Sequence, residues 1–189
     1  DPAALAGAVT AECGAHGYEG VYLDFDERTP AAEHLIEVLS PRLSERGVTL
    51  YTNPVLDTGG VTVLSTSEVT GGSFALYVRE LHERYEERTA LEMVPLCVDF
   101  TLPSNGRGET ITQERLFQLL DSGLMSYYSR ELAAKYFTYQ TSDGMTHFVL
   151  YDDAYTIREK LETAGREGAC EIFLPYTRLR DDLPDILGV

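Results

Sequence analysis

Apolar positions along the chain follow two patterns, one typical of helices and one typical of strands. Several segments place apolar side chains three or four residues apart, which predicts helices over residues 2–15, 31–47, 73–87 and 152–168. Between them lie short apolar, β-branched runs, which predict strands over residues 20–26, 48–54, 61–67, 90–103 and 170–176. Strands that alternate with helices in this way are typical of βα units around a parallel sheet.

Residues 104–150 break this alternation and predict a small insertion of α+β character. Thr112 is a suitable N-cap for a helix with an apolar face, and residues 135–151 form two alternating runs around Asp143-Gly144. An Asp-Gly pair between such runs is a strong signal for an antiparallel hairpin. We therefore expect a single domain over residues 1–189, with the insertion over residues 104–150 inside it.

Two aspartates end the first predicted strand. Asp24 and Asp26 lie on the same face of it, where aspartate is disfavoured and like charges repel, so the pair costs stability and indicates a site. Acids at the carboxyl end of a parallel strand are typical of (β/α)8 barrels. The expected fold class is therefore α/β, an incomplete TIM-barrel-like sheet of about five βα units, with a doubly wound sheet as the alternative.

The charge and composition exclude several classes of function. The chain has 189 residues, 43% of them hydrophobic, and a formal net charge of −16 that opposes a phosphate backbone. We therefore expect no nucleic-acid partner. The sequence contains no apolar run of the roughly 20 residues that span a bilayer, so we expect no membrane span.

Cysteines and histidines do not cluster in a pattern typical of a metal site. Cys13, Cys97 and Cys170 are far apart and lie in apolar contexts, which favours buried, inert thiols. The four histidines are equally scattered, without the spacing of a zinc motif. We therefore expect neither a metal site nor a cofactor. "SNGRGET" lacks the ending of a phosphate loop and is taken as a surface loop, and no GxSxG motif is present.

The stretch "EGVYLDFD" resembles the fourth-strand motif DxxDxDxE of glycoside hydrolase family 18. Glu19, Tyr22, Asp24 and Asp26 take the four signature positions, of which only Asp24 keeps the family's residue. The C-terminal part resembles the spore germination and cortex-lytic branch of that family more closely. The residues that carry this second match are Tyr139, Gly144, His147, Tyr151, Asp152, Asp153 and Lys160.

The resemblance covers most of residues 8–180 and implies strands four to eight of the family's barrel. Strands one to three have no counterpart in this sequence. An open arc would leave unpaired edges and an uncovered apolar face. We therefore expect an N-terminal segment missing from this sequence, or a second copy of the chain in a homodimer, to cover it.

The resemblance also implies a chemistry in which the substrate's acetamido oxygen is the nucleophile. By position, Asp26 would be the acid and Asp24 would orient the acetamido group. The residues implied to contact the sugar are Tyr22, Tyr51, Thr66, Phe173 and Tyr176.

Several departures weaken this chemistry. Asp26 replaces a glutamate, and Tyr22 replaces an acid of the motif. "LSTS", with Thr66, stands where the family commonly has "MTYD". Phe173 replaces the usual tryptophan, and the chain has no tryptophan.

Two functions follow from the resemblance. The first is hydrolysis of β-1,4-linked N-acetylglucosamine glycans, peptidoglycan or chitin, with catalysis weak or lost. The alternative is a non-catalytic module on the same fold that binds glycans or a protein partner. A non-glycan α/β domain is a third, weaker option. The resemblance implies an extracellular, cell-wall or spore-surface location, with a cytoplasmic one left open.

Overall fold

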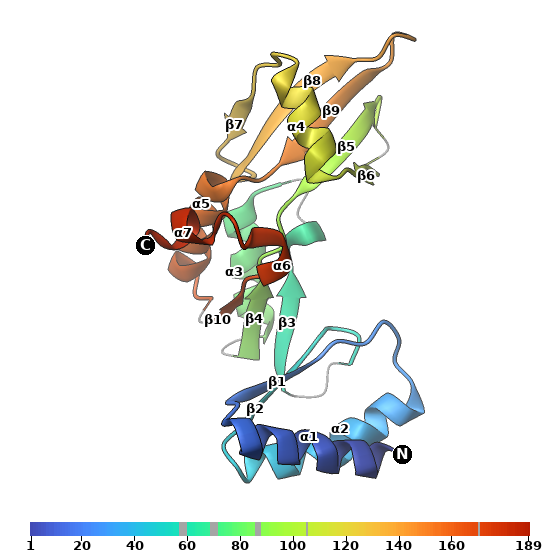
Figure 1. Ribbon diagram of the computed structural model, residues 1–189, viewed down its shortest axis with the longest axis vertical. Helices are drawn as coiled ribbons and strands as arrows, with labels where there is room; N and C mark the ends of the chain where they lie inside the picture. The colour runs from blue at the N-terminus through green and yellow to red at the C-terminus, as the bar shows by residue number, and fades with distance from the viewer. Residues whose placement is uncertain (57–59, 69–71, 86–87, 105, 170) are drawn as a thin grey trace. The chain divides into compact units, whose positions relative to one another are not determined.

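The computed structural model describes residues 1–56, 60–68, 72–85, 88–104, 106–169 and 171–189. The chain divides into two compact units (Figure 1). The first unit contains residues 1–64 and 84–91, and the second contains residues 65–83 and 92–189. Cys170 and Gly71 lie outside the described residues.

The first unit places two helices beside a parallel sheet. Its elements are α1 (Pro2–His16), β1 (Gly20–Leu23), α2 (Pro30–Ser44), β2 (Thr49–Thr52), β3 (Val61–Ser65) and β4 (Thr89–Glu92). The strands follow one another in the order β1-β2-β3-β4, and β2 is parallel to both β1 and β3. This order confirms the βα reading of the N-terminal half.

Side-chain caps and one apolar cluster hold the helices of the first unit. The Thr29 hydroxyl accepts a hydrogen bond from the Ala32 amide at the start of α2, and Gly17 ends α1 in the left-handed conformation that glycine tolerates best. Apolar residues of α1, α2 and β2 form one buried cluster between the helices and the sheet. Its buried members are Ala6, Cys13, Ala32, Leu35, Ile36, Leu39, Leu43, Leu50 and Leu56.

The second unit is built around an antiparallel sheet. Its strands are β5 (Cys97–Leu102), β6 (Glu109–Thr110), β7 (Tyr127–Ser129), β8 (Ala134–Gln140) and β9 (Thr146–Tyr151), in the order β6-β5-β9-β8-β7. Helix α4 (Gln113–Asp121) packs on one face through Leu116 and Leu119 (Figure 1). The antiparallel pairing of β8 with β9 confirms the predicted hairpin.

The second unit also contains elements from the middle and the C-terminal end of the chain, with only the last two residues of α3 assigned to the first unit. These are η1 (Thr66–Glu68), α3 (Phe74–Tyr85), α5 (Ala154–Arg166), β10 (Glu171–Phe173), α6 (Tyr176–Leu179) and α7 (Leu183–Leu187). The Met93 amide, directly after β4, donates to the Phe173 carbonyl of β10 (2.9 Å).

The strand predicted over residues 90–103 is in fact two strands. β4 ends at Glu92, and β5 begins at Cys97 in the antiparallel sheet. Pro95 lies between them, and a proline cannot donate to a strand ladder. The prediction of one continuous strand was therefore wrong, and helices α6 and α7 were not predicted.

Candidate functional site

A side chain from the neighbouring strand holds Asp24 at the exit of β1. Asn53 follows β2, and its amide nitrogen donates to the Asp24 carboxylate (2.7 Å) and to the Phe25 carbonyl (2.7 Å). Tyr22 and Tyr51 are register partners, two residues before Asp24 and Asn53 in their strands. The parallel pairing of β1 with β2 therefore brings Asp24 and Asn53 together.

Tyr22 and Asp24 belong to the face of β1 that points away from the helices. Side chains alternate between the two faces of a strand, and the intervening apolar residues pack against the cluster of α1 and α2. Tyr22 and Tyr51 are half-buried on this open face, whereas Asp24 and Asp26 are exposed. The intervening residues are Val21, Leu23 and Phe25.

Gly20 allows the Tyr51 ring to lie close to β1. A Cβ atom on Gly20 would come within 2.7 Å of Tyr51 Cε2. The first unit therefore gathers three predicted site residues, Tyr22, Asp24 and Tyr51, on one face. Asp26 follows them along the chain, and its carboxylate has no hydrogen bond or ion pair with the residues that the structure describes.

In the second unit, the Thr66 side chain stabilises the turn that follows β4. The Thr66 side chain is fully buried. Its hydroxyl accepts a hydrogen bond from the Val94 amide (3.0 Å) and donates to the Glu92 carbonyl (3.2 Å). Thr66 therefore has no exposed atom to offer a sugar, and its geometry supports a structural role in place of the expected ligand contact.

Two adjoining cavities of the second unit lie beside this turn. The polar cavity, of about 550 Å³, includes Ser65, Ser67 and Glu92 in its wall. The apolar cavity has a volume of about 750 Å³, and three apolar side chains of α4 line one side of it, namely Leu116, Phe117 and Leu120. Both cavities share the residues Pro95, Leu96, Cys97, Thr110, Thr177 and Arg178.

The polar cavity contains two charged side chains that the sequence analysis did not identify. Neither the Glu92 carboxylate nor the Arg178 guanidinium makes a hydrogen bond or ion pair with any residue that the structure describes. The Ser65 and Ser67 hydroxyls lie nearby in the same wall, 2.8 Å from each other. Glu92 was missed because the strand predicted over residues 90–103 placed it near the start of that strand. In the structure it ends β4, and the carboxyl end of a parallel strand is where functional groups are commonly found.

The two remaining predicted site residues flank this region of the second unit. Phe173 is half-buried in β10, and Tyr176 begins α6 with 62% of its surface exposed. Pro175, which lies between them, lines the polar cavity. The predicted sugar contacts thus fall in both units, with Tyr22 and Tyr51 in the first and Phe173 and Tyr176 in the second.

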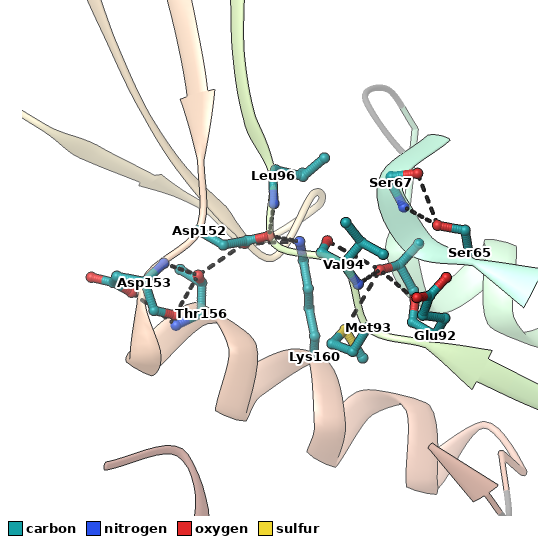
Figure 2. A network of polar contacts seen from close by, with 11 residues as sticks. Ser65, Ser67, Glu92, Met93, Val94, Leu96, Asp152, Asp153, Thr156 and Lys160 are labelled. Atoms are coloured by element: carbon teal, nitrogen blue, oxygen red, sulfur yellow. Dashed lines mark hydrogen bonds and ion pairs between the residues drawn. The ribbon is translucent and has the colours of Figure 1, made fainter. Parts of the chain in front are cut away.

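A buried ion pair fixes the wall that the two cavities share. Lys160 Nζ lies 2.6 Å from Asp152 Oδ2, and the two side chains are 1% and 0% exposed. The Asp152 carboxylate also accepts hydrogen bonds from the Leu96 amide (2.8 Å) and the Thr156 hydroxyl (2.9 Å) (Figure 2). Burial lowers the pKa of Lys160, and Asp152 opposes that shift.

Cys97 lines both cavities as a thiol of low reactivity. Burial, together with the nearby Asp152 charge, raises the pKa of Cys97 from 9.0 to about 11. Cys13 is buried, in agreement with the prediction, whereas Cys97 is only half-buried. Cys170 lies outside the described residues.

A second polar cluster lies on the antiparallel sheet. Asp99 accepts a hydrogen bond from the Tyr139 hydroxyl (2.7 Å) and pairs with His147 Nδ1 (2.9 Å). Burial and this hydrogen bond raise the pKa of Tyr139. Among the residues with described positions, no group of three or more His, Cys, Asp or Glu side chains is arranged to hold a metal ion. Within the same residues, no helix has the length and apolarity needed to cross a bilayer.

Comparison with known proteins gives matches in structure alone. Neither a family model nor a curated protein matches the sequence. The spore cortex-lytic enzyme SleL of Bacillus megaterium matches 90% of this chain at 16% identity with a TM-score of 0.62, over 48% of its own length.

Two matching structures belong to glycoside hydrolase family 18. The chitinase of Cycas revoluta, in complex with (GlcNAc)3, matches 96% of this chain at 12% identity with a TM-score of 0.62, over 69% of its own length. The N-acetylglucosaminidase of Paenibacillus barengoltzii matches 100% of this chain at 16% identity with a TM-score of 0.63, over 76% of its own length.

These matches agree with the resemblance found in the sequence. The chain spans between 48% and 76% of the length of these three proteins. A partial match of this kind fits a parallel sheet that supplies only part of a barrel. The chain has an incomplete TIM-barrel-like fold of the kind found in glycoside hydrolase family 18.

Proposed function

We propose that this chain binds β-1,4-linked N-acetylglucosamine glycans, peptidoglycan or chitin, and that its catalysis is weak or lost. The observation that carries the proposal is the hydrogen bond from Asn53 to Asp24. In the family chemistry implied by the motif, this aspartate is coupled to neighbouring acids. Here its partner is a neutral amide, and Tyr22 stands at the neighbouring acidic position.

The second aspartate also supports loss of catalysis. Asp26 is exposed, whereas a general acid usually works from a site that excludes water. Its side chain is one methylene shorter than the glutamate of the motif. A misplacement of about 1 Å can cost on the order of a hundredfold in rate.

Glycan binding is supported by what surrounds these residues. Tyr22 and Tyr51 on the open face of β1 and β2, and Phe173 and Tyr176 in the second unit, are aromatic side chains of the kind on which sugar rings stack. The matching structures include a chitinase described in complex with (GlcNAc)3 and a spore cortex-lytic enzyme. These likenesses support a location at the cell wall or spore surface.

The proposal is tested by separating binding from turnover. Sedimentation with insoluble chitin and peptidoglycan measures binding, and release of reducing ends from chitin oligosaccharides and muropeptides measures hydrolysis. We expect the chain to bind at least one polymer, and to release reducing ends at the same background rate in the wild type and in Asp26→Asn. Absence of binding to both polymers would refute the proposal.

Hydrolysis with Asp26 as a shortened acid is the second candidate, favoured by the retained Asp24. If it holds, Asp26→Asn lowers turnover below that of the wild type, and Asp26→Glu raises it because the longer side chain restores the reach. Asp185→Asn, at an exposed acid of α7, serves as the control and should leave turnover unchanged.

The organisation of the domain is also a proposal. We propose that residues 1–189 belong to one family 18-like domain that supplies the later strands of a barrel, and that a further segment or a second copy of the chain completes it. Light scattering during size-exclusion chromatography distinguishes these two, because only the second gives a dimer of this chain alone.

A further inference from the structure

The polar and apolar cavities of the second unit share one cationic side chain that pairs with no residue among those the structure describes. Arg178 lines both cavities and belongs to the short helix α6. The other cation in their walls, Lys135, is already paired with the Asp153 carboxylate. Among the cavity residues, all of which the structure describes, Arg178 is thus the cation available to a ligand.

The polar cavity combines this cation with groups that suit a sugar. Ser65 and Ser67 offer hydroxyls, and the Glu92 carboxylate can accept hydrogen bonds from hydroxyl or amide N–H groups. The cavities, of about 550 and 750 Å³, have the size of small-ligand sites. Glu92 repels an anionic group placed beside it, so an anionic group on the ligand is favoured at Arg178.

The strongly negative net charge of the chain makes a local cationic contact necessary for binding an acidic ligand. A net charge of −16 repels an acidic polymer, so such a ligand needs a specific cationic contact. A guanidinium binds a carboxylate through two parallel hydrogen bonds, which a neutral glycan cannot supply. Chitin is neutral, whereas peptidoglycan carries carboxylates on its peptides, and on the lactyl group wherever no peptide is attached.

We propose that Arg178 makes this site selective for glycans that carry carboxylates, of which peptidoglycan is the example, over neutral chitin. The inference rests on the proposed glycan binding. It adds a specificity-determining residue in the second unit to the aspartates and tyrosines of the first. Glu92 and the two serines bind the uncharged part of the ligand, and Arg178 binds its carboxylate.

The experiment compares three soluble ligands by calorimetry on the full chain. These are a chitin oligosaccharide, a peptidoglycan fragment with free carboxylates, and the same fragment with its carboxylates amidated. We expect the free acid to bind at least about tenfold more tightly than its amide, the difference typical of one charge-assisted contact. Arg178→Gln should bring the two fragments to equal affinity, and should weaken chitin binding by a smaller factor than it weakens binding of the free acid.

Two variants act as controls. Arg180→Gln removes a neighbouring arginine that is exposed and paired with Asp181, and should change no affinity. Arg178→Lys keeps the charge without the paired geometry, and should give an intermediate preference. Thermal unfolding of each variant verifies that the fold is retained.

The outcomes separate the two proposals. If Arg178→Gln still prefers the free acid as the wild type does, or weakens all three ligands equally, Arg178 does not determine specificity. If the wild type binds chitin and both fragments with one affinity, the inference fails while glycan binding stands. If none of the three ligands binds, glycan binding fails, and the specificity inference fails with it.

Discussion

The ammonium group of Lys160 lies 2.6 Å from the Asp152 carboxylate, with both side chains removed from solvent. Asp152 is further bound by the Leu96 amide and the Thr156 hydroxyl. The pair therefore ties α5 to the segment between β4 and β5. That segment, with Pro95 and Leu96, is the wall that the two cavities share.

Removing the lysine from this pair should destabilise the chain strongly. Lys160→Met leaves the Asp152 charge buried with two hydrogen-bond donors and no counter-ion. We expect a loss of about 3–5 kcal/mol in the free energy of unfolding. Urea denaturation followed by circular dichroism measures it.

The double variant Lys160→Met/Asp152→Asn provides the control. With the buried charge gone as well, it should lose less stability than Lys160→Met alone. Equal losses in the two variants would mean that the uncompensated charge is not the cause. Arg79→Met, at an exposed ion pair with Glu167, should cost much less stability than Lys160→Met, because solvent screens the exposed pair.

Asn53 should stabilise the folded chain, in addition to holding the Asp24 carboxylate in place. Asn53→Ala removes two hydrogen bonds of 2.7 Å, and we expect a loss of about 1–2 kcal/mol. Asn53→Asp should be worse, because it places a second carboxylate beside Asp24 and Asn53 Oδ1 is buried without a hydrogen-bond partner. The midpoint of urea unfolding reports both effects.

A matched variant tests whether this effect is local to the β1 exit. Gln118→Ala removes an exposed amide side chain from α4, and should change stability by less than about 0.5 kcal/mol. If Asn53→Asp is as stable as the wild type, the two side chains do not interact in solution.

Cys97 should give the chain a pH dependence at alkaline pH. Its pKa is raised from 9.0 to about 11, so between these values the folded chain holds a proton that the unfolded chain has lost. The stability that the thiol contributes is complete below pH 9 and is lost as pH rises through about 11. Cys97→Ala should therefore flatten the decline in stability over this range.

Alkylation gives an independent measurement of the same pKa. In a variant that keeps Cys97 as its only thiol, the rate of iodoacetamide labelling under native conditions should rise with a midpoint near pH 11. A midpoint near the ordinary value of 9.0 would show that burial and Asp152 do not act on the thiol.

The order of elements was predictable because it depends on local patterns. The alternation of helices and strands, the Thr112 cap and the Asp143-Gly144 hairpin all follow from spacing and turn chemistry. The break between β4 and β5 was not predicted, although Pro95 marks it. The residues on both sides of the proline are apolar, so the sequence predicts one continuous strand. The structure separates it into β4 and β5 because the two strands pair in different sheets.

The candidate site was less predictable, because its contacts join residues far apart in sequence. Asp24 and Asp26 could be identified from two acids at the end of a predicted strand, although β1 itself ends at Leu23, before both of them. The partner of Asp24 is 29 positions away, and that of Leu96 is 56 positions away, so neither contact follows from local periodicity. The sequence placed Thr66 among the sugar contacts because of its position in a motif. In the structure its side chain is buried, and its hydroxyl forms hydrogen bonds only with backbone groups and with the Met93 sulfur.

Gly108 provides the last prediction, because it allows the short strand β6 to approach β5 closely. A Cβ atom on Gly108 would overlap with Val98 Cγ1 and would lie 2.9 Å from the Phe100 ring. Gly108→Ala should therefore cost about 1–3 kcal/mol through overpacking. Gly165→Ala is the matched control, since Gly165 lies in helix α5 with open space around its Cβ position. That substitution should stabilise the chain by about 0.5–1 kcal/mol through helix propensity. Urea denaturation of both variants measures the contrast, and shifts of the same sign would show that the contact with Val98 is not formed in solution.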